Sequence, residues 1–276
     1  MLGNATFRVF ARDPALEVFG TFRREEDLPL LSTAGGARLI SGVDVLNQDA
    51  LGSALRQSRP QVVINCTGLI KQLVEANDPR VILPINAIFP HRLSDLCDLI
   101  GARLIQLSSD CVYSGRRGGY METDLSDAED LYGKSKCIGE IRHQHHVITI
   151  RTSGIGNELK SNNGLLEWFL SQRGQVKGYT KAIYSGLPSV EVARVLKDYI
   201  LPRPELSGLY HVSSKPISKY DLLNIVSETF NFDIRIVPDS SVVIDRSLNS
   251  NRFKEVTSYI SPEWPDLIKL MYENRW

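Results

Sequence analysis

Residues 102–115 read Ala-Arg-Leu-Ile-Gln-Leu-Ser-Ser-Asp-Cys-Val-Tyr-Ser-Gly, an apolar run that passes directly into hydroxyl and carboxyl side chains. The first six of these residues follow Gly101 and are typical of a buried β-strand. In an open α/β sheet, ligands bind at the carboxyl ends of the strands. The stretch therefore predicts one strand of a parallel sheet with a functional site at its end.

Short apolar runs and longer amphipathic segments alternate on both sides of this strand. Buried strands are rich in β-branched residues, whereas crossover helices carry apolar residues at three-to-four spacing. Strands are expected at residues 16–21, 37–40, 61–65 and 147–150, and helices at 50–57, 80–100 and 131–143. Repeated βαβ units with right-handed crossovers predict an α/β fold with a Rossmann-type, doubly wound parallel sheet.

The composition changes after Arg151, where glycine, serine, asparagine and lysine become frequent around residues 154–164. We therefore expect a first domain over residues 1–152, with 183–213 returning to it. A smaller α+β lobe is expected over 153–182 and 214–276. Within these segments, residues 208–212 are typical of a returning strand. Residues 218–221 resemble the capped start of a helix.

The bulk properties limit the functions to consider. The 276 residues carry 32 basic and 32 acidic side chains, so no overall field would attract nucleic acid. No apolar run approaches the roughly 20 residues that span a bilayer, and no membrane association is expected. The four cysteines show no CxxC spacing, which favours reduced thiols and a cytoplasmic protein.

Tyr132 and Lys136 lie four residues apart in an expected helix, so their side chains share one face. A phenol exchanges a proton poorly near neutrality, and a nearby ammonium eases the exchange by stabilising the phenolate. The bare spacing arises readily by chance, and a surface pair on a helix would explain it equally well. Ser109, 23 residues upstream at the end of the quoted strand, gives the pair its context; its simple structural role would be to cap a turn.

The strand ending in Ser-Ser-Asp-Cys-Val-Tyr-Ser-Gly, followed by Tyr-Gly-Lys-Ser-Lys, resembles the extended short-chain dehydrogenase/reductase family. Within this epimerase/dehydratase superfamily it is most similar to the dTDP-4-dehydrorhamnose reductase branch. The resemblance implies a catalytic Ser109, Tyr132 and Lys136, with Ser109 in place of the branch's usual threonine. Ser109 and Tyr132 would hold a sugar ketone, Tyr132 would supply the proton, and Lys136 would also bind the nicotinamide ribose.

The resemblance also implies a nucleotide site in the first domain. Asp44 and Val45 match a segment near the adenine, and Cys66, Thr67 and Gly68 match one beside the cofactor, although Thr67 and Gly68 replace alanines. Asn86 and Asp110 match positions at the substrate. Asn86 is as well explained by a hydrogen bond inside its helix.

Arg23 and Arg24 follow the strand expected at 16–21, at the position that distinguishes the two nicotinamide cofactors. An arginine there receives a 2′-phosphate, whereas an acidic residue accepts from the ribose diol. We therefore expect NADPH (NADP in preference to NAD). Pairing of the arginines with the acidic residues at 25–27 is the structural alternative.

The family opens with a strand and a Gly-x-x-Gly-x-x-Gly loop that holds the pyrophosphate. Here Met1-Leu2-Gly3 aligns with the tail of that motif, so we expect the first strand and two glycines to be missing and Gly3 to be the remaining cofactor-binding glycine. Either the start lies about ten residues upstream, or the segment and dinucleotide binding were lost. An unpaired central edge would be costly, which favours an upstream start or a replacement strand.

The resemblance, together with Ser109, Tyr132 and Lys136, implies an NADPH-dependent reductase, or reductase/epimerase, of a nucleoside-diphosphate 4-keto-6-deoxy sugar in surface-polysaccharide synthesis. The alternatives are a catalytically silent NADP-binding regulatory subunit and a sugar-nucleotide dehydratase or epimerase, for which Asp110 would be the acid-base group. A homodimer is one option for its assembly. His143, His145 and His146 are expected at a helix end, and no metal site is predicted.

Overall fold

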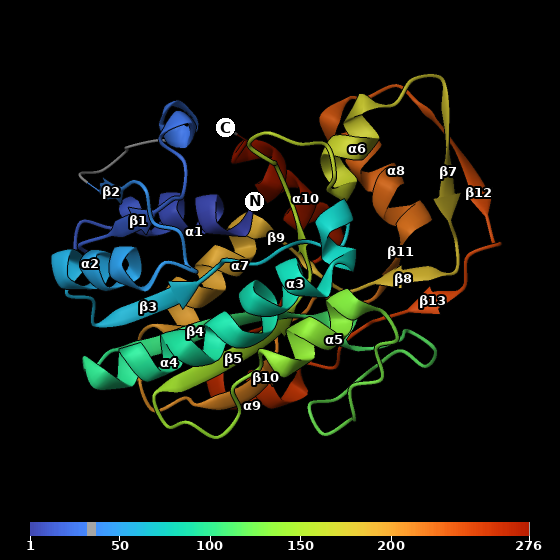
Figure 1. The fold of residues 1–276 in the computed structure, drawn as a ribbon. Helices are drawn as coiled ribbons and strands as arrows, with labels where there is room; N and C mark the ends of the chain where they lie inside the picture. The colour runs from blue at the N-terminus through green and yellow to red at the C-terminus, as the bar shows by residue number, and fades with distance from the viewer. Residues whose placement is uncertain (32–36, 276) are drawn as a thin grey trace.

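The fold is built on a four-stranded sheet in which every neighbouring pair of strands is parallel (Figure 1). The structure, a computed structural model, describes residues 1–31 and 37–275. The strand order is β10-β5-β4-β3. These strands are β3 (Val62–Asn65), β4 (Arg103–Ser109), β5 (Val147–Thr152) and β10 (Gly208–His211). The four strands predicted there are confirmed, including the one that returns from the second half of the chain.

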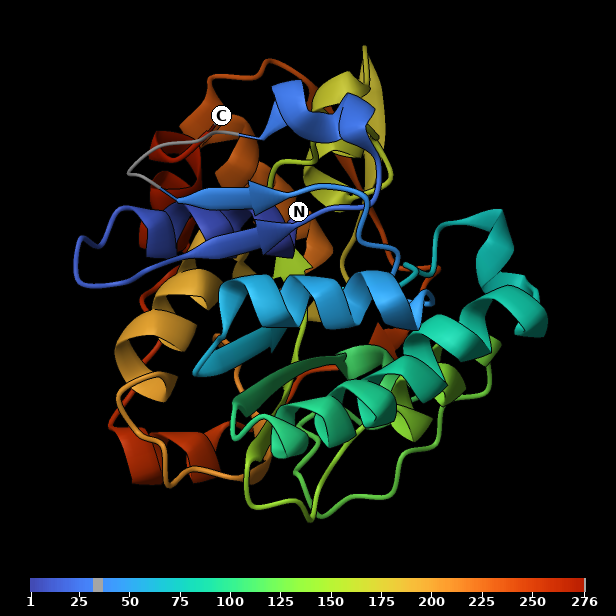
Figure 2. The ribbon, with the colours of Figure 1, turned by 60° about the vertical axis from the view of Figure 1, so that its left-hand side comes forward.

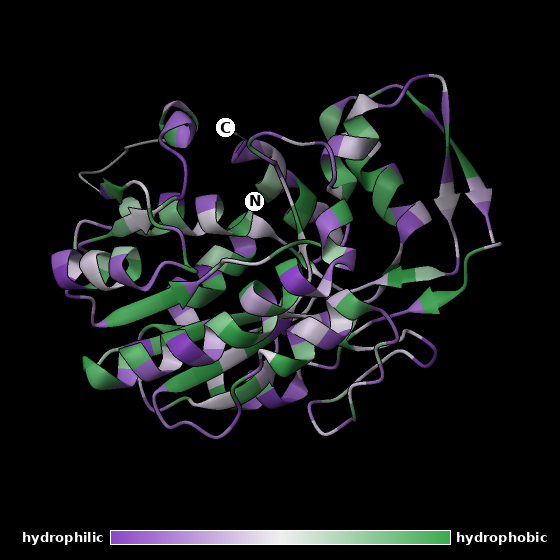
Figure 3. Cartoon of the chain, in the orientation of Figure 1, coloured by the Kyte–Doolittle hydropathy of each residue, from purple (hydrophilic) through white to green (hydrophobic). Residues whose placement is uncertain are grey.

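Helices cover both faces of the sheet, as the prediction of a doubly wound fold requires. On one face α1 (Leu2–Ala11) packs against α7 (Ser189–Val195). On the other face α2 (Gln48–Ser58) and α4 (Phe89–Leu99) enclose a second apolar core. Neighbouring residues of β4 serve the two cores in turn: Leu104 belongs to the second core and Ile105 to the first. Strands β3 and β5 are accordingly hydrophobic over most of their length (Figure 3).

Two short strands lie outside this sheet. The parallel pair β1 (Phe19–Thr21) and β2 (Arg38–Ile40) forms a sheet of its own, drawn apart from β3 in Figure 2. The strand expected from residue 16 begins only at Phe19, because Asp13 holds a turn with the backbone N–H groups of Ala15 and Leu16. Over residues 1–31 and 37–275, no strand joins β1 to β3.

The helix expected over residues 80–100 is one helical run with a change of winding inside it. It consists of α3 (Pro79–Ile82), a π-helical segment (Leu83–Ile88) and α4. Pro84 lies in the π-helical segment and cannot donate the hydrogen bond that an α-helix would need there. Such wide turns occur often at functional sites, and this one contains Asn86.

The helix expected over residues 131–143 is five residues shorter, because α5 spans Leu131–Ile138. It ends at Gly139, where a Cβ atom would lie 2.1 Å from the carbonyl oxygen of Asn86. Only glycine permits this close approach of two backbones. His143, His145 and His146 therefore lie in the loop before β5, and their expected position at a helix end is wrong.

The remaining elements are short strands, helices and turns, most of them beyond β5 (Figure 1). Strand β8 (Ala182–Tyr184) stands between β11 (Ile217–Ser218) and β13 (Ile244–Asp245), and β7 (Gln175–Tyr179) pairs with β12 (Arg235–Asp239). Also present are β6 (Gly154–Ile155), β9 (Leu187–Pro188), α6 (Leu165–Ser171), α8 (Lys219–Phe230), α9 (Asn251–Thr257), α10 (Trp264–Glu273), a π-helical stretch (Leu196–Ile200) and 3-10 turns at Glu25–Leu30, Val74–Asn77 and Asp110–Val112.

The predicted cap of α8 is confirmed, since the Ser218 hydroxyl accepts from the backbone N–H of Asp221 at 3.0 Å. In the described part of the chain, no helix combines the length and the apolar character needed to cross a bilayer.

A buried ion pair connects β4, β5 and the end of α5. The Arg151 guanidinium donates to both carboxylate oxygens of Glu140, at 2.6 and 2.7 Å, and both side chains are fully buried. Ser108 donates to the same carboxylate at 2.7 Å, and Arg151 also donates to the Tyr113 hydroxyl. Burial acts to raise the pKa of Glu140, but the hydrogen bonds and charge of Arg151 outweigh it, so the pKa lies below its usual value.

We expect Arg151→Met to lower the free energy of unfolding by about 3–5 kcal/mol, because it leaves the Glu140 carboxylate buried without its main partner. Arg142→Met is the matched control, since Arg142 binds the same carboxylate at 2.6 Å but is 36% exposed. Its loss should cost at most about 1 kcal/mol. Urea unfolding of the two variants measures the difference, and equal losses would contradict this assignment.

Candidate active site

The Ser109 side chain stands where β4 ends and the chain turns. Its hydroxyl accepts from the backbone N–H of Cys111 at 3.1 Å and donates to Asp110 Oδ1 at 3.1 Å. Ser109 therefore has the capping role that was its structural alternative, as the N-cap of the 3-10 turn that follows. Burial raises the pKa of Asp110, although the hydrogen bond from Ser109 and the charge of Arg246 act against it.

Tyr132 is brought to Ser109 by the close packing of α5 on this turn. A Cβ atom on Gly133 would lie 2.2 Å from the carbonyl oxygen of Cys111, so the helix can approach only with glycine there. Asp130 starts the helix by accepting from the Gly133 N–H at 2.8 Å. Burial raises the pKa of the Tyr132 phenol, and a hydrogen bond with Ser109 opposes the shift. The phenol therefore keeps its proton at neutral pH.

Lys136 lies one turn further along α5 and is buried, with 8% of its surface exposed. The interpretation of a solvated surface pair is therefore wrong for this residue. Its ammonium donates to the carbonyl oxygen of Leu107 at 2.8 Å, in the strand that ends at Ser109. Burial lowers the pKa of Lys136 to about 8, while the charge of Glu140 acts in the opposite direction.

Asn86 connects the loop after β3 to the helices. Its side-chain oxygen accepts from the Leu69 N–H at 2.8 Å, and its amide nitrogen donates to the Leu69 carbonyl at 3.1 Å and to the Ser135 hydroxyl at 3.4 Å. These contacts replace the hydrogen bond inside the helix that was the alternative explanation. Asn86 is thus a positioning residue that ties the loop after β3 to α5.

The expected cofactor residues at the end of β3 gather near the start of α1. A Cβ atom on Gly3 would lie 3.3 Å from Cβ of Cys66, and one on Gly68 would lie 3.9 Å from the Lys136 ammonium. Burial raises the pKa of the Cys66 thiol to about 11. Thr67 and Gly68 are exposed. The structure therefore places the first turn of α1, the loop after β3 and Lys136 side by side.

The other nucleotide candidates lie in loops after β1 and β2. Arg24 pairs with Glu26 at 3.3 Å, as the structural alternative foresaw, and both side chains are mostly exposed. Arg23 is also exposed. Asp44 accepts from the backbone N–H of Leu46 at 2.9 Å in the turn before α2, and Val45 packs against the second core.

Several polar residues that the sequence does not mark as site residues lie around Asp110. Arg246 and Lys219 act on the Asp110 carboxyl by their charge, and Ser153 by a hydrogen bond. Arg246 is fixed by donation to the carbonyl oxygen of Tyr113 at 2.8 Å. These residues come from beyond β5, where no motif marks them, so only the fold reveals that two cations face the end of β4.

The buried Lys136 ammonium predicts a dependence of stability on pH. Because the pKa falls from its usual 10.5 to about 8 on folding, the unfolded chain binds more protons between these values, and stability rises with pH in that window. The free-energy penalty of burying the protonated Lys136 is fully present below pH 8. Lys136→Met should remove it, so the difference in unfolding free energy between variant and wild type should change by roughly 2–3 kcal/mol from pH 7 to pH 10.

Urea unfolding at both pH values measures this change. Lys134→Met, at an exposed position of the same helix, is the control and should show no comparable dependence. A pH-independent difference for Lys136→Met would mean that the ammonium is solvated.

A hydroxyl, a phenol and an ammonium lie at the carboxyl edge of a doubly wound sheet, which is the arrangement that the resemblance to extended short-chain dehydrogenases/reductases predicts. The chain belongs to the RmlD substrate binding domain family, whose model matches residues 15–246. The predicted family resemblance and fold class are thereby confirmed.

Curated relatives carry two different descriptions. The chain is 33% identical to a dTDP-4-dehydrorhamnose reductase of Streptomyces griseus over 116 residues. This alignment covers 41% of this chain and 38% of that protein. It is 23% identical over 258 residues to the methionine adenosyltransferase 2 subunit beta of Bos taurus, covering 88% of this chain and 74% of that protein.

Solved structures share the fold over most of the chain. A dTDP-4-dehydrorhamnose reductase from Bacillus anthracis in complex with NADP superposes with a TM-score of 0.76 at 20% identity. The match covers 94% of this chain and 99% of the reductase chain. A UDP-glucose 4-epimerase from Thermus thermophilus with NAD also has a TM-score of 0.76, at 17% identity, covering 99% and 95%.

Proposed function

We propose that the chain is an NADPH-dependent reductase, or reductase/epimerase, of a nucleoside-diphosphate 4-keto-6-deoxy sugar. The observation that carries this proposal is the placement of Ser109, protonated Tyr132 and buried Lys136 around the end of β4. Family membership and the likeness to dTDP-4-dehydrorhamnose reductases support it. The pathway would be nucleotide-sugar synthesis for a surface polysaccharide in the cytoplasm, where the four unpaired thiols would persist.

Residues near the start of α1 fit a dinucleotide. The N-terminal turn of a helix favours anions, and Gly3 there leaves room beside Cys66. Thr67 and Gly68 are exposed beside Lys136, which would hold the nicotinamide ribose. Asp44 and Val45 would lie near the adenine. NADPH would supply the hydride.

The chain's own residues would polarise and protonate the ketone. The hydroxyls of Ser109 and Tyr132 would donate hydrogen bonds to the carbonyl oxygen, and negative charge grows on that oxygen as the ketone is reduced. Tyr132 enters the reaction with its proton, because burial raises its pKa, and would pass it to this oxygen. The Lys136 ammonium, one helical turn away, would stabilise the phenolate that remains.

Two cations would act on the substrate. Arg246 and Lys219 face Asp110 from beyond β5, where they would meet a substrate diphosphate. We accordingly propose residues 1–152 and 183–213 as the cofactor domain, and 153–182 and 214–276 as the substrate lobe.

Tyr132→Phe tests the catalytic role. It should lower kcat for NADPH oxidation with dTDP-4-dehydrorhamnose by about 100-fold or more, the usual contribution of a general acid. NADPH affinity, measured by fluorescence titration, should change by less than about threefold, because the phenyl ring preserves the packing. Tyr272→Phe, at a position 44% exposed, is the control and should leave both values unchanged. Failure of the wild-type chain to bind NADPH would sink the proposal.

Arg23 and Arg24 test the choice of cofactor. Replacing both with alanine should weaken NADPH binding about 10- to 100-fold, since a charged hydrogen bond to a phosphate contributes about 1.5–3 kcal/mol. NADH binding should change little, because NADH lacks the 2′-phosphate. Arg38→Ala, which removes another exposed arginine, is the control. Equal losses for both cofactors would place the 2′-phosphate elsewhere.

A second candidate is a regulatory subunit that binds NADP without turnover. The alignment with methionine adenosyltransferase 2 subunit beta over 88% of the chain favours it. Tight NADPH binding with no oxidation in the presence of dTDP-4-dehydrorhamnose would support this candidate over the reductase.

A further inference from the structure

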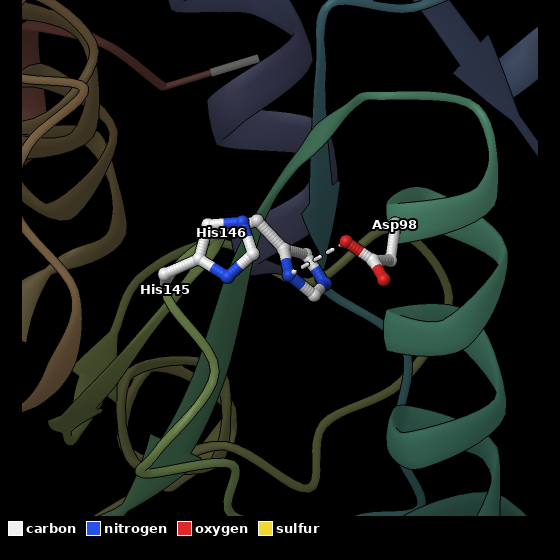
Figure 4. Close-up of side chains that lie close together, drawn as sticks. All are labelled: Asp98, His145 and His146. Carbon is white, nitrogen blue, oxygen red and sulfur yellow. Dashed lines mark ion pairs between the residues drawn. The ribbon is translucent and has the colours of Figure 1, made fainter.

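Three side chains of the types that bind metal ions meet near the amino ends of the strands, at the opposite side of the sheet from Ser109. Asp98 comes from the last turn of α4, and His145 and His146 come from the loop before β5. One ligand atom from each lies within 4.8 Å of the other two. Figure 4 shows His145 and Asp98 on either side of His146. No sequence motif reveals this group, because Asp98 lies far from the histidines along the chain.

His146 is held in a form that leaves one nitrogen available. Its side chain is 9% exposed, and its Nε2 lies 3.0 Å from the carbonyl oxygen of Ser94. A carbonyl can only accept, so Nε2 carries a proton and donates it, and Nδ1 bears a lone pair whenever the ring carries no second proton. A backbone carbonyl in this position is the usual outer partner of a metal-binding histidine.

The buried Nδ1 atom has no hydrogen-bond partner among the described residues. It faces the Asp98 carboxylate, with 3.5 Å between Nδ1 and Oδ1. A lone pair and a carboxylate are both acceptors, so this arrangement needs a cation between or beside them, either a proton or a metal ion.

The end of α4 adds a second reason for a cation. The last turn of this helix carries Asp98 and no basic residue. The C-terminal end of a helix is the negative end of its dipole, where a carboxylate is unfavourable and a cation is stabilised.

We propose that Asp98, His145 and His146 bind one divalent cation of the zinc type, with water completing the coordination. Two imidazoles and one carboxylate are a ligand set that suits Zn²⁺. Ligand atoms of a tetrahedral zinc site lie about 3.3–3.5 Å apart, so atoms now within 4.8 Å of one another must approach by at most about 1.5 Å. His145 and Asp98 are exposed and can rotate, whereas His146 is fixed. The cation would join α4 to β5 and would be structural.

The test is a calorimetric titration of the full chain with Zn²⁺ alone, after tag removal and chelator treatment. We expect one Zn²⁺ per chain and, at a 100-fold excess over Kd, a rise in Tm of about 5 °C. His145→Ala and Asp98→Asn alter exposed side chains, should still fold, and should each weaken binding by at least about tenfold. His143→Ala, in the same loop but outside the group, should bind as the wild type does.

Co²⁺ gives an independent readout, because a tetrahedral nitrogen and oxygen site produces a strong visible absorption that His145→Ala should abolish. Absence of Zn²⁺ binding would overturn the proposal and assign the cation to a proton shared by His146 and Asp98. Binding that survives both Asp98→Asn and His145→Ala, or that His143→Ala removes equally, would also overturn it.

Discussion

The buried contact between Glu140 and Arg151 is the interaction on which the rest of the arrangement depends. Arg151 belongs to β5 and Glu140 follows α5, so the pair fixes how the helix lies on the sheet. Ser108 donates to the same carboxylate from β4. Because side chains alternate along a strand, holding Ser108 on one face directs Ser109 to the other. An ion pair deep in the protein thereby sets the position of a hydroxyl that it never touches.

The sequence was sufficient for the parallel sheet and for the residues at its edge. Period and composition located β3, β4, β5 and β10, because buried parallel strands leave a strong apolar signal. Helix ends were harder to place. Gly139 stops α5 because another backbone passes within van der Waals distance, and nothing local to residues 131–143 indicates that approach. Pro84 was visible in the sequence, but its effect was a change of winding rather than an end.

The candidate site likewise contains residues that the sequence predicts and residues that only the fold reveals. A motif on two neighbouring elements predicts the three residues Ser109, Tyr132 and Lys136. The last two lie on the same helix, α5. Burial of Lys136 could not be read from its position in a short amphipathic segment, although this burial is what lowers its pKa. Arg246 and Lys219 reach Asp110 only through the folding of the second half of the chain, where short strands provide little periodic signal.

The separate β1–β2 pair has a consequence for motion. Its strands are three residues each, and their side chains are exposed or only half-buried, so little apolar contact holds this corner in place. Such regions open with small free energies while the central strands stay closed. Arg23 and Arg24 lie two and three residues beyond the end of β1. A dinucleotide reaching from α1 to these arginines would connect this weakly packed corner to the helices on the central sheet, and some of its binding energy would be used to order that corner.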